Sequence, residues 1–110
     1  MSIDQANVID LITSDKESGL ITLIISDGLS WEDEQHLQKL QDKLNSYLAF
    51  VQSGDLYKKY PDAQGKRVRI ELICRLAPNE MGKEFLQLCA EAIMDAGYQF
   101  NYRIFEPKPA

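Results

Sequence analysis

The clearest pattern in the chain is the alternation of apolar and polar side chains over residues 67–76. A period of two is typical of a β-strand that buries one face and leaves the other wetter. Three arginines and a glutamate on the second face argue against burial on both sides. We therefore predict a strand with two different faces. The inward set is Val68, Ile70, Leu72, Cys74 and Leu76, and the outward set is Arg67, Arg69, Glu71, Ile73 and Arg75.

Three further strands are predicted from shorter apolar runs. Residues 8–13 and 20–26 flank the polar segment S-D-K-E-S-G of residues 14–19, which indicates a hairpin. Residues 98–105 form the last strand, whose expected core side chains are Tyr98, Phe100, Tyr102 and Ile104. Residues 20–26 are apolar on both faces, so the pattern leaves open which set points inward. The two sets are Leu20 and Ile24, or Ile21, Leu23 and Ile25.

Two helices are predicted between these strands. Ser30 is a favourable N-cap, and the acids at residues 32–34 then lie in the first turn, where the helix dipole favours negative charge. This helix runs to about Ser53, with an apolar stripe at helical spacing. A second helix begins near Pro78, because proline is tolerated in a first turn, and ends at Gly97. Its expected inward stripe is Phe85, Leu88, Cys89, Ala92, Ile93 and Ala96.

The resulting order of elements is β-β-α-β-α-β, which predicts an α+β fold. A strand, a helix and a strand in succession normally form a right-handed parallel crossover. Two such crossovers that advance in one direction put both helices on the same face of the sheet. We therefore predict a two-layer α/β sandwich, with a mixed four-stranded sheet and two helices on one face. Residues 1–106 are expected to form a single compact domain, and residues 107–110 a loose C-terminal tail.

The composition is that of a globular protein, with 45% hydrophobic and 26% charged residues. Residues 1–55 carry 10 acids and 3 bases, whereas residues 56–110 carry 7 acids and 9 bases. These charges either neutralise each other within the fold or form a polarised surface that meets a charged partner. No apolar run is long enough to span a bilayer, and the first residues lack the regions of a signal peptide. We expect a cytoplasmic protein with no membrane association, in which Cys74 and Cys89 are reduced.

Two segments carry a resemblance to a known family. They are S-I-D-Q-A-N-V-I-D at residues 2–10 and the more specific Y-L-A-F-V-Q-S-G-D-L-Y-K-K-Y-P-D-A-Q-G-K at residues 47–66. Together with the last strand, they make nearly the whole chain resemble a small bacterial family known only as a domain of unknown function. The resemblance implies a compact α/β domain of the bacterial cytosol. It implies no catalytic residue, cofactor or substrate.

Few residues suggest catalysis or ligand binding. His36, the sole histidine, shares a helical face with Glu32, but we interpret it as a solvated side chain beside the acids of the first turn. Cys74 and Cys89 lie in apolar stripes, where burial makes a thiol inert. No closely spaced Cys/His pair is present, so we expect neither a metal nor another cofactor. A small-ligand or enzyme site would lie near the first helix and its following loop, and would use Glu32, His36, Tyr57 and Tyr60.

The basic outward face of the sheet is the leading candidate for an interaction surface. It is expected to hold Arg67, Arg69, Ile73, Arg75 and Arg103. Nucleic acid is disfavoured, because RNA-binding sheets stack bases on aromatic side chains, which these outward positions lack. Arginine beside aliphatic residues suits a protein interface. We therefore expect a non-enzymatic interaction module that binds a protein partner or a second copy of itself, with an immunity or antitoxin-type protein as a special case by analogy.

Overall fold

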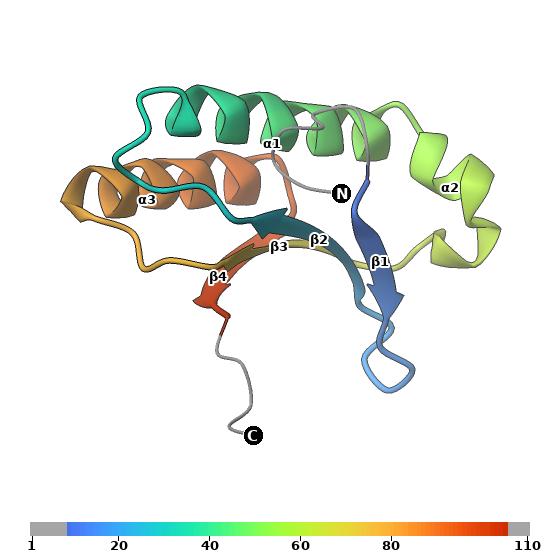
Figure 1. The fold of residues 1–110 in the computed structure, drawn as a ribbon. Coiled ribbons are helices and arrows are strands. Elements are labelled where there is room, and N and C mark those ends of the chain that lie inside the picture. The colour runs from blue at the N-terminus through green and yellow to red at the C-terminus, as the bar shows by residue number, and fades with distance from the viewer. Residues whose placement is uncertain (1–8, 106–110) are drawn as a thin grey trace, which may run out of the picture.

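A computed structural model describes residues 9–105, and Figure 1 shows two layers, with the helices on one side of a curved sheet. The strands are β1 Leu11–Ser14, β2 Ile21–Asp27, β3 Val68–Cys74 and β4 Gln99–Ile104. The helices are α1 His36–Gln52, α2 Asp55–Lys59, the short 3-10 helix η1 Pro61–Ala63 and α3 Glu80–Asp95. The predicted two-layer α+β sandwich is confirmed, with α2 and η1 added between α1 and β3.

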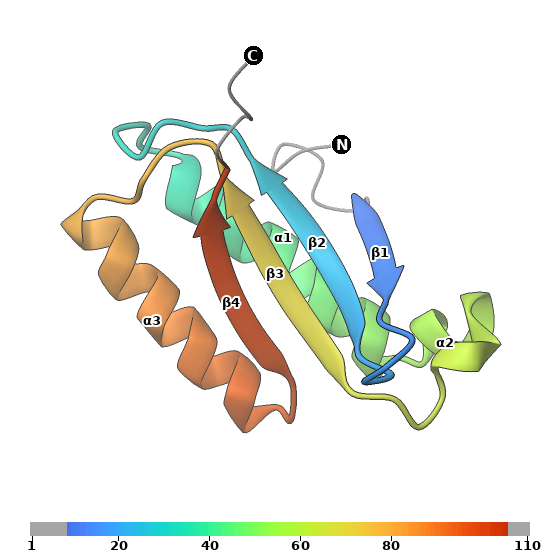
Figure 2. The same ribbon diagram turned by 90° about the horizontal axis from the view of Figure 1, so that it is seen from below.

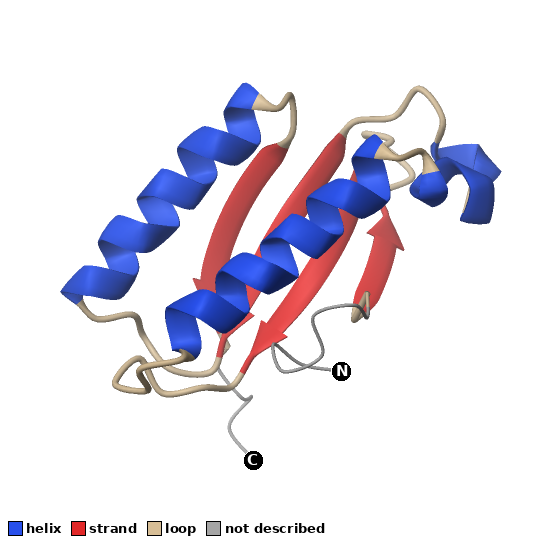
Figure 3. Cartoon of the chain, turned by 90° about the horizontal axis from the view of Figure 1, so that it is seen from above, coloured by secondary structure: helices blue, strands red, loops and turns tan. Residues whose placement is uncertain are grey.

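The sheet is mixed, as predicted. Its strand order is β1-β2-β3-β4, in which β1 pairs antiparallel with β2, while β2, β3 and β4 run parallel. Each parallel connection passes through a helix, and α1 and α3 lie on the same side of the sheet (Figure 3). From the opposite side, the four strands lie in front of the helices and no described element covers them (Figure 2). The sheet therefore has one covered face and one open face.

The register decides which side chains of β2 enter the core. Leu23 lies opposite Ile70 of β3, and both are fully buried beneath the helices. The same face carries the other inward residues of the two strands, which are Ile21, Ile25, Val68, Leu72 and Cys74. Ile24 therefore points to the open face, since neighbouring residues in a strand alternate between faces. The helices close the core with Leu40, Leu44, Tyr47, Val51, Leu86 and Ile93.

Two strand ends differ from the prediction by more than one residue. β1 begins at Leu11, whereas the apolar pattern suggested residues 8–13, of which residue 8 lies outside the described residues. Asp10 interrupts that run, and its carboxylate accepts the backbone N–H of Ser26 on β2. β3 ends at Cys74, and Leu76 beyond it is exposed. At both places the tertiary structure shortens a strand that the apolar pattern alone would extend.

β4 leaves two of its predicted core residues half exposed. Tyr102 and Ile104 lie opposite Leu72 and Cys74, so they point to the helical side, yet they are 39% and 41% exposed. The reason is the position of α3, which projects beyond β4 on the side away from β3 (Figures 2 and 3). The prediction that both side chains lie in the core is therefore wrong.

The first helix begins later than its capping pattern suggests. α1 starts at His36, and no side chain caps it. The Ser30 hydroxyl accepts the N–H of Glu32, and the Asp33 carboxylate accepts the N–H of Gln35. Such local side-chain bonds to the backbone compete with helix formation, which is why serine and aspartate favour turns as well as caps. The acids at residues 32–34 therefore lie in turns before α1, and the predicted acidic first turn is wrong.

The second long helix, α3, is correctly placed but rotated relative to the predicted stripe. Asn79 caps it by accepting the Gly82 N–H at 2.8 Å. Leu86 is buried, whereas Leu88, which we expected in the core, is 64% exposed. The predicted stripe residues Ala92 and Ala96 are exposed as well. The apolar residues of α3 span too much of its circumference for spacing alone to show which part meets the sheet.

A close contact between α3 and the segment before α1 gives a first testable prediction. A Cβ atom at Gly82 would lie 2.6 Å from Cε3 of Trp31, whose indole N–H donates to the Leu76 carbonyl at 3.0 Å. We expect Gly82→Ala to lower the free energy of unfolding by about 1–3 kcal/mol, since overpacking strains a filled site. Helix propensity alone predicts the opposite sign, because alanine is favoured over glycine by about 1 kcal/mol.

Urea unfolding of the variant measures this difference. The cost of Gly82→Ala should shrink in a Trp31→Leu background, where the smaller side chain makes room for the methyl group. A Gly82→Ala protein more stable than the wild type would show that the indole moves aside freely, contrary to the prediction.

None of the helices within residues 9–105 is long and apolar enough to cross a membrane. The predicted C-terminal tail, residues 107–110, lies outside the described residues.

Candidate functional site

The open face of the sheet brings together the outward side chains of all four strands. In the register of the ladder, Thr22, Arg69 and Gln99 form one row across β2, β3 and β4. The next row holds Leu11 of β1 with Ile24, Glu71 and Asn101. The third row holds Ser26, Ile73 and Arg103. Aliphatic side chains thus lie beside arginines on a surface that no described element covers (Figure 2).

A polar network occupies the β3–β4 half of this face. The side-chain amide of Asn101 donates to Glu71 Oε1 at 2.9 Å, and Arg103 Nε lies 3.7 Å from the same oxygen. Because a carboxylate only accepts hydrogen bonds, this contact fixes the amide so that Asn101 Oδ1 points away from Glu71. Asn101 Oδ1 and Arg69 Nε are both buried and have no hydrogen-bond partner among the described residues. Such atoms are costly unless something satisfies them.

The five predicted interface residues are divided between the face and its ends. Arg69, Ile73 and Arg103 lie on the open face itself. Arg67 and Arg75 are exposed just before and just after β3. Arg75 lines a small hollow of about 220 Å³ at the carboxyl end of the parallel strands, together with Ser26, Asp27, Gly28, Ile73 and Phe105.

His36 is buried, so its interpretation as a solvated side chain is wrong. The residue is 0% exposed; its Nε2 lies 2.5 Å from Asp27 Oδ2, and its Nδ1 lies 3.0 Å from the Ser30 carbonyl. The Trp31 ring packs against it, with 4.0 Å between the ring centroids. Nδ1 must donate to the carbonyl, because a carbonyl oxygen only accepts, and Nε2 forms the hydrogen bond with the Asp27 carboxylate. Both ring nitrogens are occupied, which makes the pair a link between β2 and α1 and leaves no nitrogen for a substrate.

The two cysteines are free and poorly reactive. Cys74 is buried at the end of β3, opposite Asp27, and burial raises the pKa of its thiol to about 12. Burial likewise raises the pKa of the Cys89 thiol to about 11. Neither thiol therefore forms the nucleophilic thiolate near neutral pH. Among residues 9–105, no group of three or more His, Cys, Asp or Glu side chains could hold a metal ion.

The residues proposed for a small-ligand site are not brought together. Glu32 and His36 lie before and at the start of α1, whereas Tyr57 and Tyr60 lie in and just after α2. α1 separates the two pairs by 17 residues, about 25 Å at 1.5 Å per residue. Tyr57 is half-buried and Tyr60 is exposed. A single ligand of ordinary size cannot contact both ends.

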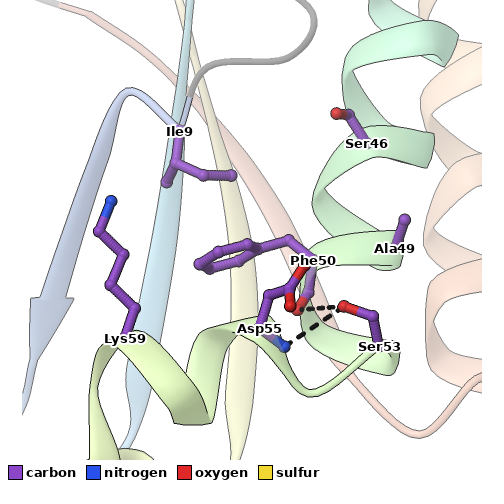
Figure 4. Close-up of a pocket in the computed structure, with 7 residues that line it drawn as sticks. All are labelled: Ile9, Ser46, Ala49, Phe50, Ser53, Asp55 and Lys59. Carbon is purple, nitrogen blue, oxygen red and sulfur yellow. Dashed lines mark hydrogen bonds between the residues drawn. The ribbon is translucent and has the colours of Figure 1, made fainter.

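A hollow does lie near the second pair, between the start of the described chain, α1 and α2 (Figure 4). It has a volume of about 610 Å³, and Phe50 and Ile9 supply its apolar surface. The Ser53 hydroxyl donates to the Phe50 carbonyl and accepts from the Asp55 N–H, so this polar group is already used locally. Lys59 also borders a second hollow of about 390 Å³, which Tyr60 lines.

A second buried ion pair, which the sequence pattern did not predict, joins α1 to the residue before β1. Lys43 is 0% exposed, and its ammonium donates to Asp10 Oδ1 at 2.8 Å. The Tyr47 hydroxyl accepts the Asp10 N–H at 2.8 Å and donates to the Ile24 carbonyl at 2.7 Å. Burial raises the pKa of Tyr47, which keeps the hydroxyl protonated as a donor. The sequence feature that could have indicated the burial of Lys43 is its position directly beside Leu44, in the apolar stripe of α1.

Comparison with known families gives one result. A model for a family of unknown function, DUF6572, matches residues 1–106. The chain belongs to this family. The match confirms the resemblance that residues 2–10 and 47–66 carry. No curated protein and no solved structure matches the chain.

Proposed function

We propose that this DUF6572 domain is a non-enzymatic interaction module that binds a protein through the open face of its sheet. The observation that supports the proposal is a pair of buried polar atoms on this face, Arg69 Nε and Asn101 Oδ1, that have no hydrogen-bond partner within residues 9–105. Ile24 and Ile73 beside them supply apolar contact area. Uncovered aliphatic surface with arginine is the composition expected of an interface rather than of ordinary surface.

The charge of this face suggests the chemistry of the partner. Glu71 is the only acid in its three strand rows, against two arginines, and Arg67 and Arg75 add positive charge at the ends. An acidic protein surface is therefore the best match. A second copy is the simplest example, since its helical layer exposes Asp42, Glu80, Glu84, Glu91 and Asp95. An immunity or antitoxin-type protein remains a special case by analogy.

The proposal places the protein in the bacterial cytoplasm. Its two free cysteines suit a reducing compartment.

Sedimentation velocity of the wild type and of the double variant Arg69→Glu with Ile73→Asp tests the interface. We expect the wild type to associate, with itself or with a partner from host lysate, and to do so less at high salt because charges contribute. The variant should lose this association and still unfold cooperatively in urea. The matched control is Lys58→Glu with Tyr60→Asp, a similar change on the exposed surface at α2. A wild type that stays monomeric and retains no partner through this face would refute the proposal.

The second candidate function is small-ligand binding at the hollow between α1 and α2 (Figure 4). The observation in its favour is the volume of about 610 Å³, lined by Phe50, Asp55 and Lys59, a size within the usual range for ligand sites. Loss of a bound molecule in a Lys59→Glu variant, which changes the lining of this hollow, but not in the open-face variant would favour this alternative.

A further inference from the structure

Among the described residues, no strand pairs with the outer edge of β4, which we call the free edge of the sheet, and the direction of its backbone groups can be assigned. The Phe105 N–H donates to the Cys74 carbonyl of β3 at 2.7 Å. Backbone groups of successive residues in a strand point to opposite sides. Asn101 and Arg103 therefore also direct their N–H and C=O groups toward β3. The backbone groups of Phe100, Tyr102 and Ile104 point away from β3, toward the edge where the strand order ends.

This edge lacks several of the features that protect a terminal strand. Natural edges are kept short, or carry proline or an inward-pointing charge. β1, the opposite edge, has only four residues. β4 has six residues, Gln99–Ile104, with no proline, and its inward side chains are all apolar or aromatic. An open backbone of this kind is a template for pairing with another strand.

On the helical side of the sheet, α3 covers the position that a fifth strand beside β4 would occupy. The helix projects beyond β4 in both views along the sheet normal (Figures 2 and 3). Phe85 and Cys89 line the groove toward α1. Ala90 and Met94 follow these residues by five positions each, about 140° around the helix, so they lie on the side away from α1. Met94 is 64% exposed there, above the free edge.

The open-face side of the same edge carries an exposed cation and one buried polar atom without a partner among the described residues. The Arg103 side chain is exposed and only loosely associated with Glu71, at 3.7 Å. Asn101 Oδ1 is buried without a partner among the described residues. Both residues alternate with Tyr102 along β4 and so face away from the helices. In a strand added here, every second side chain would lie on the same face of the sheet as Arg103.

We infer that the free edge of β4 binds an extended segment of a partner protein as a fifth strand. Its inward side chains would be apolar and lie beneath α3 against Tyr102, Ile104 and Met94. Its outward side chains would be acidic and face Arg103. This inference rests on the proposed function, because the added strand would extend the open face at β4 and so names the class of protein partner. Strand addition of this kind gains affinity from main-chain hydrogen bonds and specificity from alternate side chains.

A second copy fits this edge less well than a peptide does. Antiparallel pairing of two β4 strands would join the sheets with both helical layers on the same side. Each α3 already projects beyond its own β4 (Figure 2), so the two helices would compete for the space above the seam. A peptide brings no helix of its own.

Affinity selection from a displayed library of random peptides, each about seven residues long as a typical strand is, tests the inference on the wild-type protein. We expect enrichment of sequences that alternate apolar and acidic residues. Bound peptide should protect the N–H groups of Phe100, Tyr102 and Ile104 from hydrogen exchange. Enrichment without alternation, or no enrichment, would overturn the inference. Protection of these groups that depends on protein concentration in the absence of peptide would overturn it in favour of a second copy.

Changes on both partners sharpen the test. Tyr102→Pro removes one edge-facing N–H and no hydrogen bond to β3. It should lower the affinity for the enriched peptide about tenfold. Tyr102→Ala is the control, because alanine keeps that N–H donor. Arg103→Glu should shift selection from acidic to basic residues. Against the unmodified protein, N-methylation of the peptide's edge-facing amides should abolish binding, and methylation of the alternate amides should not. Equal binding of both methylated peptides would refute strand pairing.

The two proposals fail in different ways. The Arg69→Glu, Ile73→Asp variant leaves the β4 backbone unchanged, and Tyr102→Pro leaves Arg69 and Ile73 unchanged. A host partner that is lost only with the first variant would support the open face and overturn the fifth strand. Retention of that partner by both variants would overturn both.

Discussion

Replacement of Lys43 by methionine is expected to lower the free energy of unfolding by about 3–5 kcal/mol, because it leaves a buried carboxylate without its cation. Lys43 and Asp10 are joined at 2.8 Å, and both side chains are buried. Within residues 9–105, the remaining partner of the Asp10 carboxylate would be the Ser26 N–H at 2.9 Å. Methionine has a similar length and packs well, so the loss reflects the charge rather than a cavity.

A double-mutant cycle, measured by urea unfolding, separates the cost of the unpaired Asp10 charge from the other effects of replacing Lys43. Asp10→Asn in the Lys43→Met background removes the unpaired charge, and it should recover part of the lost stability. Lys83→Met on the surface of α3 is the matched control, since its contact with Glu80 is exposed and 3.6 Å long; such pairs contribute at most about 1 kcal/mol. A loss below about 1 kcal/mol for Lys43→Met would mean that water reaches the pair.

Leu86→Ala is expected to cost about 2–5 kcal/mol, the usual effect of deleting a large side chain from a filled core. Leu86 is almost fully buried between α3 and the sheet. Leu88, two residues further along the same helix, is 64% exposed, and its replacement by alanine should change stability by less than about 0.5 kcal/mol.

The pair of leucine variants measures the rotation of α3 directly. Both changes remove the same atoms from the same helix, so helix propensity and the unfolded state contribute almost equally. Chemical unfolding of the two proteins gives the difference. Equal losses, or a larger loss for Leu88→Ala, would place the predicted stripe in the core and contradict the structure.

The order and kind of the main elements followed from the sequence because burial on one side imposes a period. Val68, Ile70 and Leu72 alternate with charged residues, so only a strand buries them together. The same reasoning placed Arg69, Ile73 and Arg103 on a common face, and the register confirms that arrangement. Two parallel crossovers in one direction then required both helices to lie on the other face.

The polar interior was decided only by the tertiary structure. Asp10 and Lys43 are 33 residues apart, and each is a charged residue that sequence rules place on the surface. Burial of either becomes tolerable only when the fold brings the other within hydrogen-bond distance. Asp27 and His36 follow the same logic, since their contact depends on where the turns after Ser30 let α1 begin.

The detailed geometry of the candidate site was likewise a tertiary outcome. The contact between Glu71 and Asn101 depends on the register of β3 and β4, which are joined through α3 and have no local pairing signal. The exposure of Tyr102 and Ile104 depends on α3 lying beyond the edge strand. Alternation determines which face a side chain occupies, but only the packing of a helix on that face determines whether the side chain is buried.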